Sequence, residues 1–221
     1  MESLLVRPSH SRSGTAKHMK SFKTFLKESA VKAHHVLAFG RMNPITNGHE
    51  ALVNKVHEVA KEHGASHSIV LSHSHDPKKN PLSAEQKLKH AKRAFPDTNV
   101  STSSPSKPSI LHQAVDLHKQ GVQHLHVVAG SDRKDEMHNL LHRYNGKKMD
   151  HGTYHFKSID VHSSGERDPD AEGTSGMSAS KMRAHAAAGE KKEFHAGAPS
   201  KMSKTHRDEM YHDVRQGMQL K

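Results

Sequence analysis

A chain of 221 residues with 32% hydrophobic and 4% aromatic side chains suits one α/β domain with tails, whose core must rest on aliphatic residues and Met. The absence of Cys excludes disulfides and thiolate chemistry, and no stretch approaches the ~18 apolar residues of a membrane helix or resembles a secretory signal, so we expect a cytoplasmic protein. The formal net charge of +11 favours anionic ligands, and nucleotides, nucleic acid and acidic proteins all fit it.

The sequence divides into three parts. Residues 1–30 are rich in polar side chains and are predicted to be a flexible tail, in which Phe22, Phe25 and Leu26 have the spacing of a short amphipathic helix. Residues 31–200 are predicted to form the folded domain. Residues 201–221 are expected to form a C-terminal helical tail.

Within the domain, short apolar runs alternate with segments of helical periodicity. We predict strands over residues 36–39, 68–72, 125–129 and 155–161, and helices over 48–63, 83–95, 110–120, 136–144 and 178–188. Ser83 and Gln86 have capping-box spacing at one helix start, and Gly121 follows another helix end. The alternation predicts an α/β fold, a Rossmann-like doubly wound parallel sheet with helices on both faces.

Ligands of such sheets bind at the carboxyl ends of the strands. Three polar segments follow predicted strands here, namely residues 40–49, 72–81 and 130–133. We therefore expect these segments to surround one binding site.

The segment Gly40–His49 joins a strand to a helix and carries the strongest chemical signal. We expect Gly40 to permit a tight turn, and Gly48 to let a phosphate approach the amide groups at the helix start. Thr46 and His49 can donate hydrogen bonds to phosphoryl oxygens, and a protonated His49 would stabilise charge that grows on phosphorus. The pattern predicts a polyphosphate site.

Asn43-Pro44-Ile45-Thr46-Asn47-Gly48-His49 resembles the (H/T)xGH signature of the nucleotidyltransferase superfamily. A second segment, Met177-Ser178-Ala179-Ser180-Lys181-Met182-Arg183, resembles its C-terminal signature, with Ser180 in place of Thr. The resemblance implies that both segments bind the triphosphate. It implies catalytic roles for Thr46, His49 and Arg183, and it implies nucleotide binding by Gly40, Arg41, Asn43, Gly48, Gly130, Ser131, Asp132, Ser178 and Ser180.

The stretch from Ser72 to Ser83 is similar to the corresponding part of nicotinamide-nucleotide adenylyltransferases, and Ala188-Gly189-Glu190 is similar to a turn of the same group. This implies acceptor binding by Lys78, Lys79 and Asn80, whose cationic and amide groups suit a phosphate and a ribose. The sites also resemble those of nucleotidyltransferase-like proteins of large tailed phages, for which the location would be the host cytoplasm.

We therefore predict an enzyme that transfers AMP from ATP to a phosphate-bearing acceptor such as nicotinamide mononucleotide, with Mg²⁺ as cofactor and release of pyrophosphate. The alternatives are cytidylyl transfer from CTP and a non-catalytic nucleotide-binding or virion-associated protein with the same fold. The insert 145–173 is interpreted as a lid or partner loop, and homo-oligomer formation stays open.

Histidine is unusually frequent, with 24 residues spread along the chain. We interpret them as surface composition, and a dispersed zinc or nickel site is the alternative. The sequence alone assigns none of them to a metal.

Overall fold

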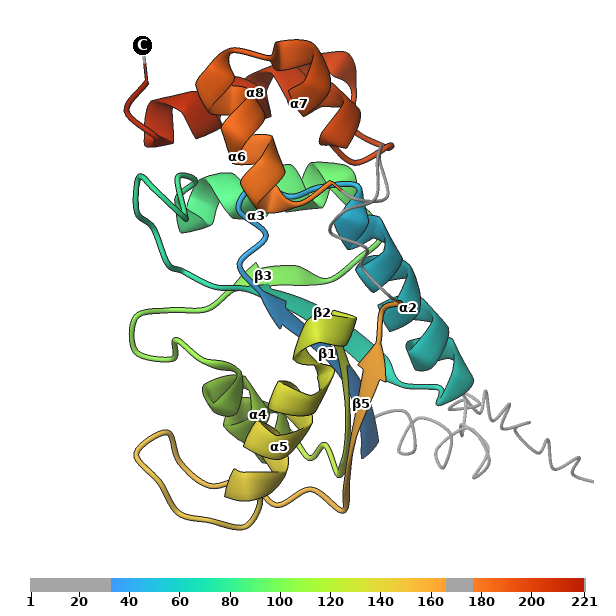
Figure 1. Ribbon diagram of the computed structural model, residues 1–221. Coiled ribbons are helices and arrows are strands. Elements are labelled where there is room, and N and C mark those ends of the chain that lie inside the picture. Colours follow the sequence, from blue (N-terminus) through green and yellow to red (C-terminus); the bar gives the residue numbers. More distant parts are fainter. Residues whose placement is uncertain (1–32, 166–176, 221) are drawn as a thin grey trace, which may run out of the picture.

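The computed structural model describes residues 33–165 and 177–220 (Figure 1). The predicted tail over residues 1–30, with the short helix expected in it, falls outside the described residues. The strands are β1 (His34–Gly40), β2 (Ser66–Leu71), β3 (Val100–Thr102), β4 (His124–Ala129) and β5 (Ser158–Ser163). They form one sheet in the order β3-β2-β1-β4-β5, and all four pairings are parallel.

This strand order confirms the predicted doubly wound sheet. The chain moves outward from β1 to β3, returns to the centre at β4 and ends at β5. The connections that leave β1 and β4 therefore lead to opposite sides of the sheet. In such sheets the crevice that binds ligands opens between these two strands.

Helices cover both faces of the sheet (Figure 1). Their bounds are α2 (Gly48–Glu62), α3 (Ala84–Ala94), α4 (Ile110–Lys119), α5 (Lys134–Tyr144), α6 (Ala179–Ala188), α7 (Lys191–Gly197) and α8 (Lys204–Gly217), with a 3₁₀ turn, η1, over Ser131–Arg133. Ser83 and Gln86 form the expected capping box at the start of α3.

Alternation along the strands sorts the core into two layers. Val36 and Ala38 of β1 pack with α2, α3 and the α6–α8 group. Leu37, which lies between them, packs with α4 and α5 on the other face. β1 is thus buried on both faces, as expected of a central parallel strand.

Several elements differ from the prediction, among them the helix α7, which was not predicted. β5 begins at Ser158 instead of 155, because Tyr154 and Phe156 leave the strand path and are buried against α5 and α4. β3 was not predicted, since three residues give no usable periodicity. α8 falls in the expected tail, and its side chains Met210, Tyr211 and Val214 are buried in the core.

Candidate active site

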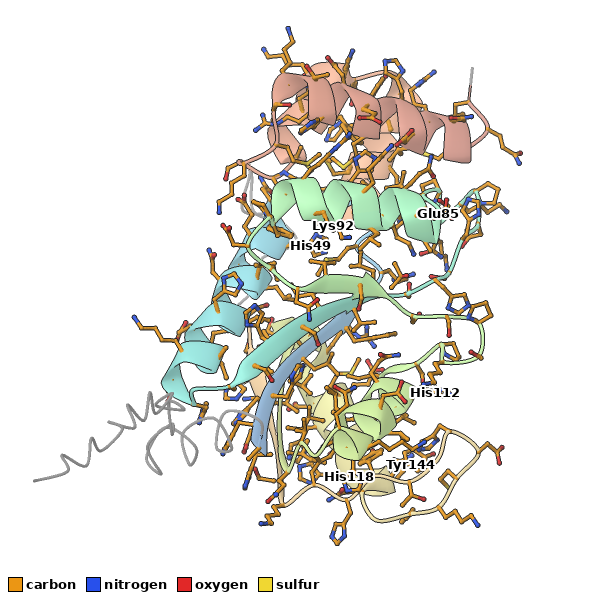
Figure 2. All side chains as sticks on the ribbon, turned by 180° about the vertical axis from the view of Figure 1, so that it is seen from behind. His49, Glu85, Lys92, His112, His118 and Tyr144 are labelled. Carbon is orange, nitrogen blue, oxygen red and sulfur yellow. The ribbon has the colours of Figure 1, made fainter. Side chains whose placement is uncertain are left out.

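A cavity of about 730 Å³ opens at the carboxyl ends of β1 and β4, between the start of α2 and the start of α6. The predicted residues that line it are Gly40, Arg41, Gly48, His49, Lys79, Gly130, Asp132 and Arg183. Figure 2 shows His49 at the end of α2 that lies next to the helical layer of α3 and α6–α8. The two signature segments, which are far apart in sequence, therefore face one cavity.

His49 is held by the turn that starts α2. Its Nδ1 accepts a hydrogen bond of 2.9 Å from the backbone N–H of Thr46 and lies 3.1 Å from the Thr46 hydroxyl. An accepting Nδ1 needs its lone pair, so the ring proton sits on Nε2. This geometry leaves Nε2–H as the hydrogen-bond donor that His49 can offer to a phosphoryl oxygen.

Thr46 is fully buried and does not line the cavity. Its backbone N–H and its hydroxyl both contact His49, and the direct phosphate contact that the resemblance implied stays a prediction.

Asn43 fixes the shape of the loop. Its side chain donates to the carbonyl of Leu82 at 2.9 Å and accepts from the Leu82 amide at 3.0 Å. The side chain is buried and both its polar ends are paired within the protein, so Asn43 ties the loop to the segment before α3 instead of facing the cavity.

The second signature divides its roles among three residues. Ser178 caps α6, where its hydroxyl accepts a hydrogen bond of 3.0 Å from the amide of Lys181. The hydroxyl of Ser180 accepts from Arg183 Nη2 at 3.0 Å, and Arg183 Nη1 donates to the carbonyl of Asn43 at 2.7 Å. Neither serine lines the cavity; Ser180 contacts Arg183, and Ser178 caps the helix that carries Arg183.

Burial, and then the nearby charge of Arg41, lowers the pKa of Arg183 from its ordinary value. A guanidinium keeps its charge in proteins all the same. Arg183, a partly desolvated cation near the charge of Arg41, gains from an anion beside it, which is what a triphosphate provides.

Gly48 allows the two signatures to approach closely. A Cβ at this position would lie 3.2 Å from the backbone oxygen of Met177 and 3.4 Å from Thr46 Oγ1. Gly40, by contrast, lies in β1 and a Cβ there would meet nothing within 4 Å. The turn itself comes later, where Met42 has a φ of 42°, so the expectation that Gly40 makes the turn is wrong.

Lys79 is the acceptor-loop residue that lines the cavity. Asp76 shapes the turn before it, because its carboxylate accepts from the amides of Lys78 at 3.0 Å and Lys79 at 2.7 Å. These hydrogen bonds hold the pKa of Asp76 at about 2. Asn80 also donates to Asp76 and is buried, so Lys78 and Asn80 stand away from the cavity wall.

The residues after β4 form the opposite wall. Gly130 and Asp132 line the cavity and Ser131 does not. The carboxylate of Asp132 folds back over Gly130, where an added Cβ would lie 2.6 Å from its Oδ1. Asp132 therefore offers an oxygen ligand at the rim.

The wall of the cavity is cationic. Among the described residues it carries two carboxylates, Glu50 and Asp132, against five cations. The cations are Arg41, Lys79, Arg133, Arg183 and Arg207. Glu50 is engaged by the amide and hydroxyl of Ser200, each at 2.7 Å.

Arg133 lies in the segment 130–133 that was expected at the site, although no role was assigned to it, and Arg207 was not predicted. Arg133 follows the Gly130–Asp132 segment directly, and its position there was the available signal. Arg207 lies in α8 and donates to the carbonyls of Pro199 and Ser200, at 3.2 and 3.1 Å, so it joins the site only through the fold.

A doubly wound parallel sheet with an anion-attracting cavity at its switch point defines a nucleotide-binding α/β protein. The sequence model of the cytidylyltransferase-like family matches residues 37–184, which is more than half of the chain and includes both signature segments. The chain belongs to this family, and it is a nucleotidyltransferase that acts on a nucleoside triphosphate. A comparison with curated proteins finds no significant match.

In the stretches 33–165 and 177–220, no helix has both the length and the apolar character needed to cross a membrane.

Proposed function

We propose that the protein transfers AMP from ATP to a phosphate-bearing acceptor such as nicotinamide mononucleotide. The observation that carries the proposal is that His49 and Arg183 line one cationic cavity, while Arg183 is bonded to the loop that leads to His49. Lys79 lines the same cavity and supplies a cation for a second phosphate, which belongs to the acceptor.

The reaction is an in-line displacement. An acceptor phosphate oxygen attacks the α-phosphorus of ATP, a new P–O–P bond forms, and the bond from that phosphorus to the bridging β-phosphate oxygen breaks. Pyrophosphate leaves with the electron pair, and no covalent enzyme intermediate is formed. His49, through Nε2–H, and Arg183 neutralise charge on the phosphoryl oxygens, and positioning supplies the rest of the rate enhancement.

Magnesium suits this cavity. Mg²⁺ prefers oxygen ligands and usually keeps several waters, with one or two carboxylates and the substrate phosphates completing its shell. Asp132 places such a carboxylate on the wall. Asp132 would hold the ion directly or through water, and the ion would neutralise triphosphate charge.

Cytidylyl transfer is the second candidate, and the match to the cytidylyltransferase-like family favours it. In that case CTP replaces ATP and the acceptor is a phosphorylated alcohol, while His49 and Arg183 keep the same roles.

A nucleotide panel tests the proposal. The full-length protein is incubated with Mg²⁺ and each of ATP, CTP, GTP and UTP, with nicotinamide mononucleotide or glycerol 3-phosphate, and released pyrophosphate is measured. We expect release with ATP and the mononucleotide, loss of release with EDTA, loss in His49→Ala, and no change in His212→Ala, an exposed residue of α8. Release confined to CTP would establish the second candidate. ATP binding with no release for any acceptor would favour a non-catalytic nucleotide-binding protein.

A further inference from the structure

Three histidines meet near the amino ends of β1 and β4, whereas the cavity lies at the carboxyl ends of these strands. His34 is the first residue of β1, His126 is the third residue of β4, and His63 follows the last residue of α2. One ring nitrogen of each lies within 4.8 Å of those of the other two. These residues are separated in sequence and have no part in the nucleotide site.

Strand pairing explains the meeting. His34 pairs with His124 across β1 and β4, and His126 pairs with Asp160 across β4 and β5. Because side chains alternate, His34 shares a face with Val36 and Ala38, which is the face that α2 covers. The C-terminal end of α2 then brings His63 onto the same patch (Figure 1).

The distances suit a shared cation. His34 Nδ1 and His126 Nε2 are 3.1 Å apart. In a tetrahedral zinc site with Zn–N bonds of about 2.0–2.1 Å, two ligand nitrogens lie about 3.3 Å apart. A zinc ion could therefore replace the proton between these two nitrogens with little movement of either ring. The His63 ring is stacked on His126 with centroids 4.1 Å apart, and it must turn about its side-chain bonds to point a nitrogen at the ion.

The second ring nitrogen of His126 has neighbours that can take its proton. Its Nδ1 lies 3.3 Å from His162 Nε2 and 3.8 Å from an Asp160 carboxylate oxygen. Metal-bound imidazoles usually donate their second N–H to such groups, which fixes the tautomer and raises ligand basicity. A proton on Nδ1 leaves Nε2 of His126 with its lone pair toward His34 and His63.

Burial lowers the pKa values of two of the three histidines. Burial, and then the nearby charge of His63, lowers the pKa of His126 to about 4. Burial, followed by repulsion from His124 and His63, lowers the pKa of His34 as well. Neutral imidazole is the metal-binding form.

We propose that His34, His63 and His126 bind one divalent transition-metal ion of the zinc class, with water in the fourth position. Three imidazoles match the nitrogen preference of this class and are unsuited to Mg²⁺ or Ca²⁺. The ion would cross-link the end of α2 to β1 and β4. It would stabilise the helix whose other end carries Gly48 and His49.

Zinc titration of the full chain, purified without an affinity tag and freed of metal by a chelator, tests this site. Calorimetry gives stoichiometry and affinity, and thermal unfolding gives stabilisation. The variant is His63→Ala, at the end of a helix where loss of a side chain leaves the core intact. The matched control is His138→Ala, which breaks a different histidine pair on α5, where the His138 and His142 ring centroids are 4.2 Å apart.

We expect one tight zinc equivalent in the wild type and in His138→Ala, and affinity at least about tenfold weaker in His63→Ala. At 100-fold excess over the dissociation constant, zinc should raise the unfolding temperature of the wild type by about 5–10 °C, and that of His63→Ala much less. Equal affinity in all three proteins would overturn the proposal, because it would mean adventitious binding to surface histidines. A magnesium titration that gave the same stabilisation would overturn it too.

Discussion

The guanidinium of Arg183 donates a hydrogen bond of 2.7 Å to the backbone carbonyl of Asn43, 140 residues earlier in the chain. Asn43 in turn is bonded through its side chain to Leu82. Hydrogen bonds therefore join both signature segments to the segment before α3 in the absence of a ligand. This preorganisation places charge where we propose that a triphosphate binds, so that little reorganisation is needed on binding.

Replacement of Arg183 should affect catalysis more than folding. We expect Arg183→Ala to lower kcat/KM by about 10²–10³, the cost of one preorganised donor. Arg183→Lys keeps the charge but cannot bond Asn43 and Ser180 together with the same fork, so it should restore only part of the activity. Steady-state kinetics with the substrate pair from the nucleotide panel measures both, and wild-type rates in Arg183→Ala would contradict the assignment.

The roles of Thr46 and His49 are separable. The hydrogen bond from the Thr46 backbone to His49 Nδ1 survives in Thr46→Val, because only the hydroxyl is lost. We expect His49→Ala to lower turnover by about 10²-fold or more and Thr46→Val to cost much less. If the two substitutions were equally damaging, the Thr46 hydroxyl would have a direct role that its buried position does not explain.

Lys87 should make stability rise in alkaline solution. It is buried, donates to the carbonyls of Ser72 and Ser74, and burial lowers its pKa to about 8 from 10.5. Between pH 8 and 10.5 the unfolded chain keeps a proton that the folded protein has lost, so raising the pH favours the folded state. The gain is on the order of 3 kcal/mol.

Because other groups also titrate in that pH range, the contribution of Lys87 is measured as the difference in unfolding free energy between the wild type and Lys87→Met. Denaturant unfolding of the wild type and Lys87→Met is compared at pH 8 and pH 10. We predict a more positive pH slope in the wild type, and parallel slopes would show that Lys87 has its ordinary pKa in the fold.

α8 should behave as part of the domain core. Met210 is fully buried, and Met210→Ala should cost about 2–5 kcal/mol of unfolding free energy. Met149→Ala is the control, because Met149 is 44% exposed and should change stability little. Chemical denaturation of both variants checks this, and a small effect at Met210 would mean that α8 detaches without loss of the core.

Much of this fold could be predicted from the sequence, because the signals for helix ends are local. Ser83 and Gln86 sit at a capping box, and Gly121 follows the end of α4 as predicted. β3 and the packing of α8 depend on contacts made by the whole fold. Lys89 of α3, for example, pairs with Glu209 of α8 at 2.8 Å, and neither residue signals this alone.

The structure shows which of the predicted site residues meet at the cavity, while their roles stay predictions. Gly48, His49 and Arg183 line the cavity as expected, but Asn43 and Ser180 are paired within the protein and support it. Motif spacing identifies which residues converge and cannot tell which of them face the ligand. The histidine cluster could be located only from the register of the strands. The sequence gives one sign of it, because histidines at 124 and 126 alternate in a strand and so share one face of the sheet.

The central proposal is that His49 and Arg183 bind the same triphosphate. Calorimetric titration with α,β-methylene ATP, which cannot be cleaved at the reacting bond, and with adenosine tests it in the wild type, His49→Ala and Arg183→Ala. We predict that each substitution weakens binding of the triphosphate by about tenfold or more and leaves adenosine binding unchanged. Unaltered triphosphate affinity in either variant would contradict the account.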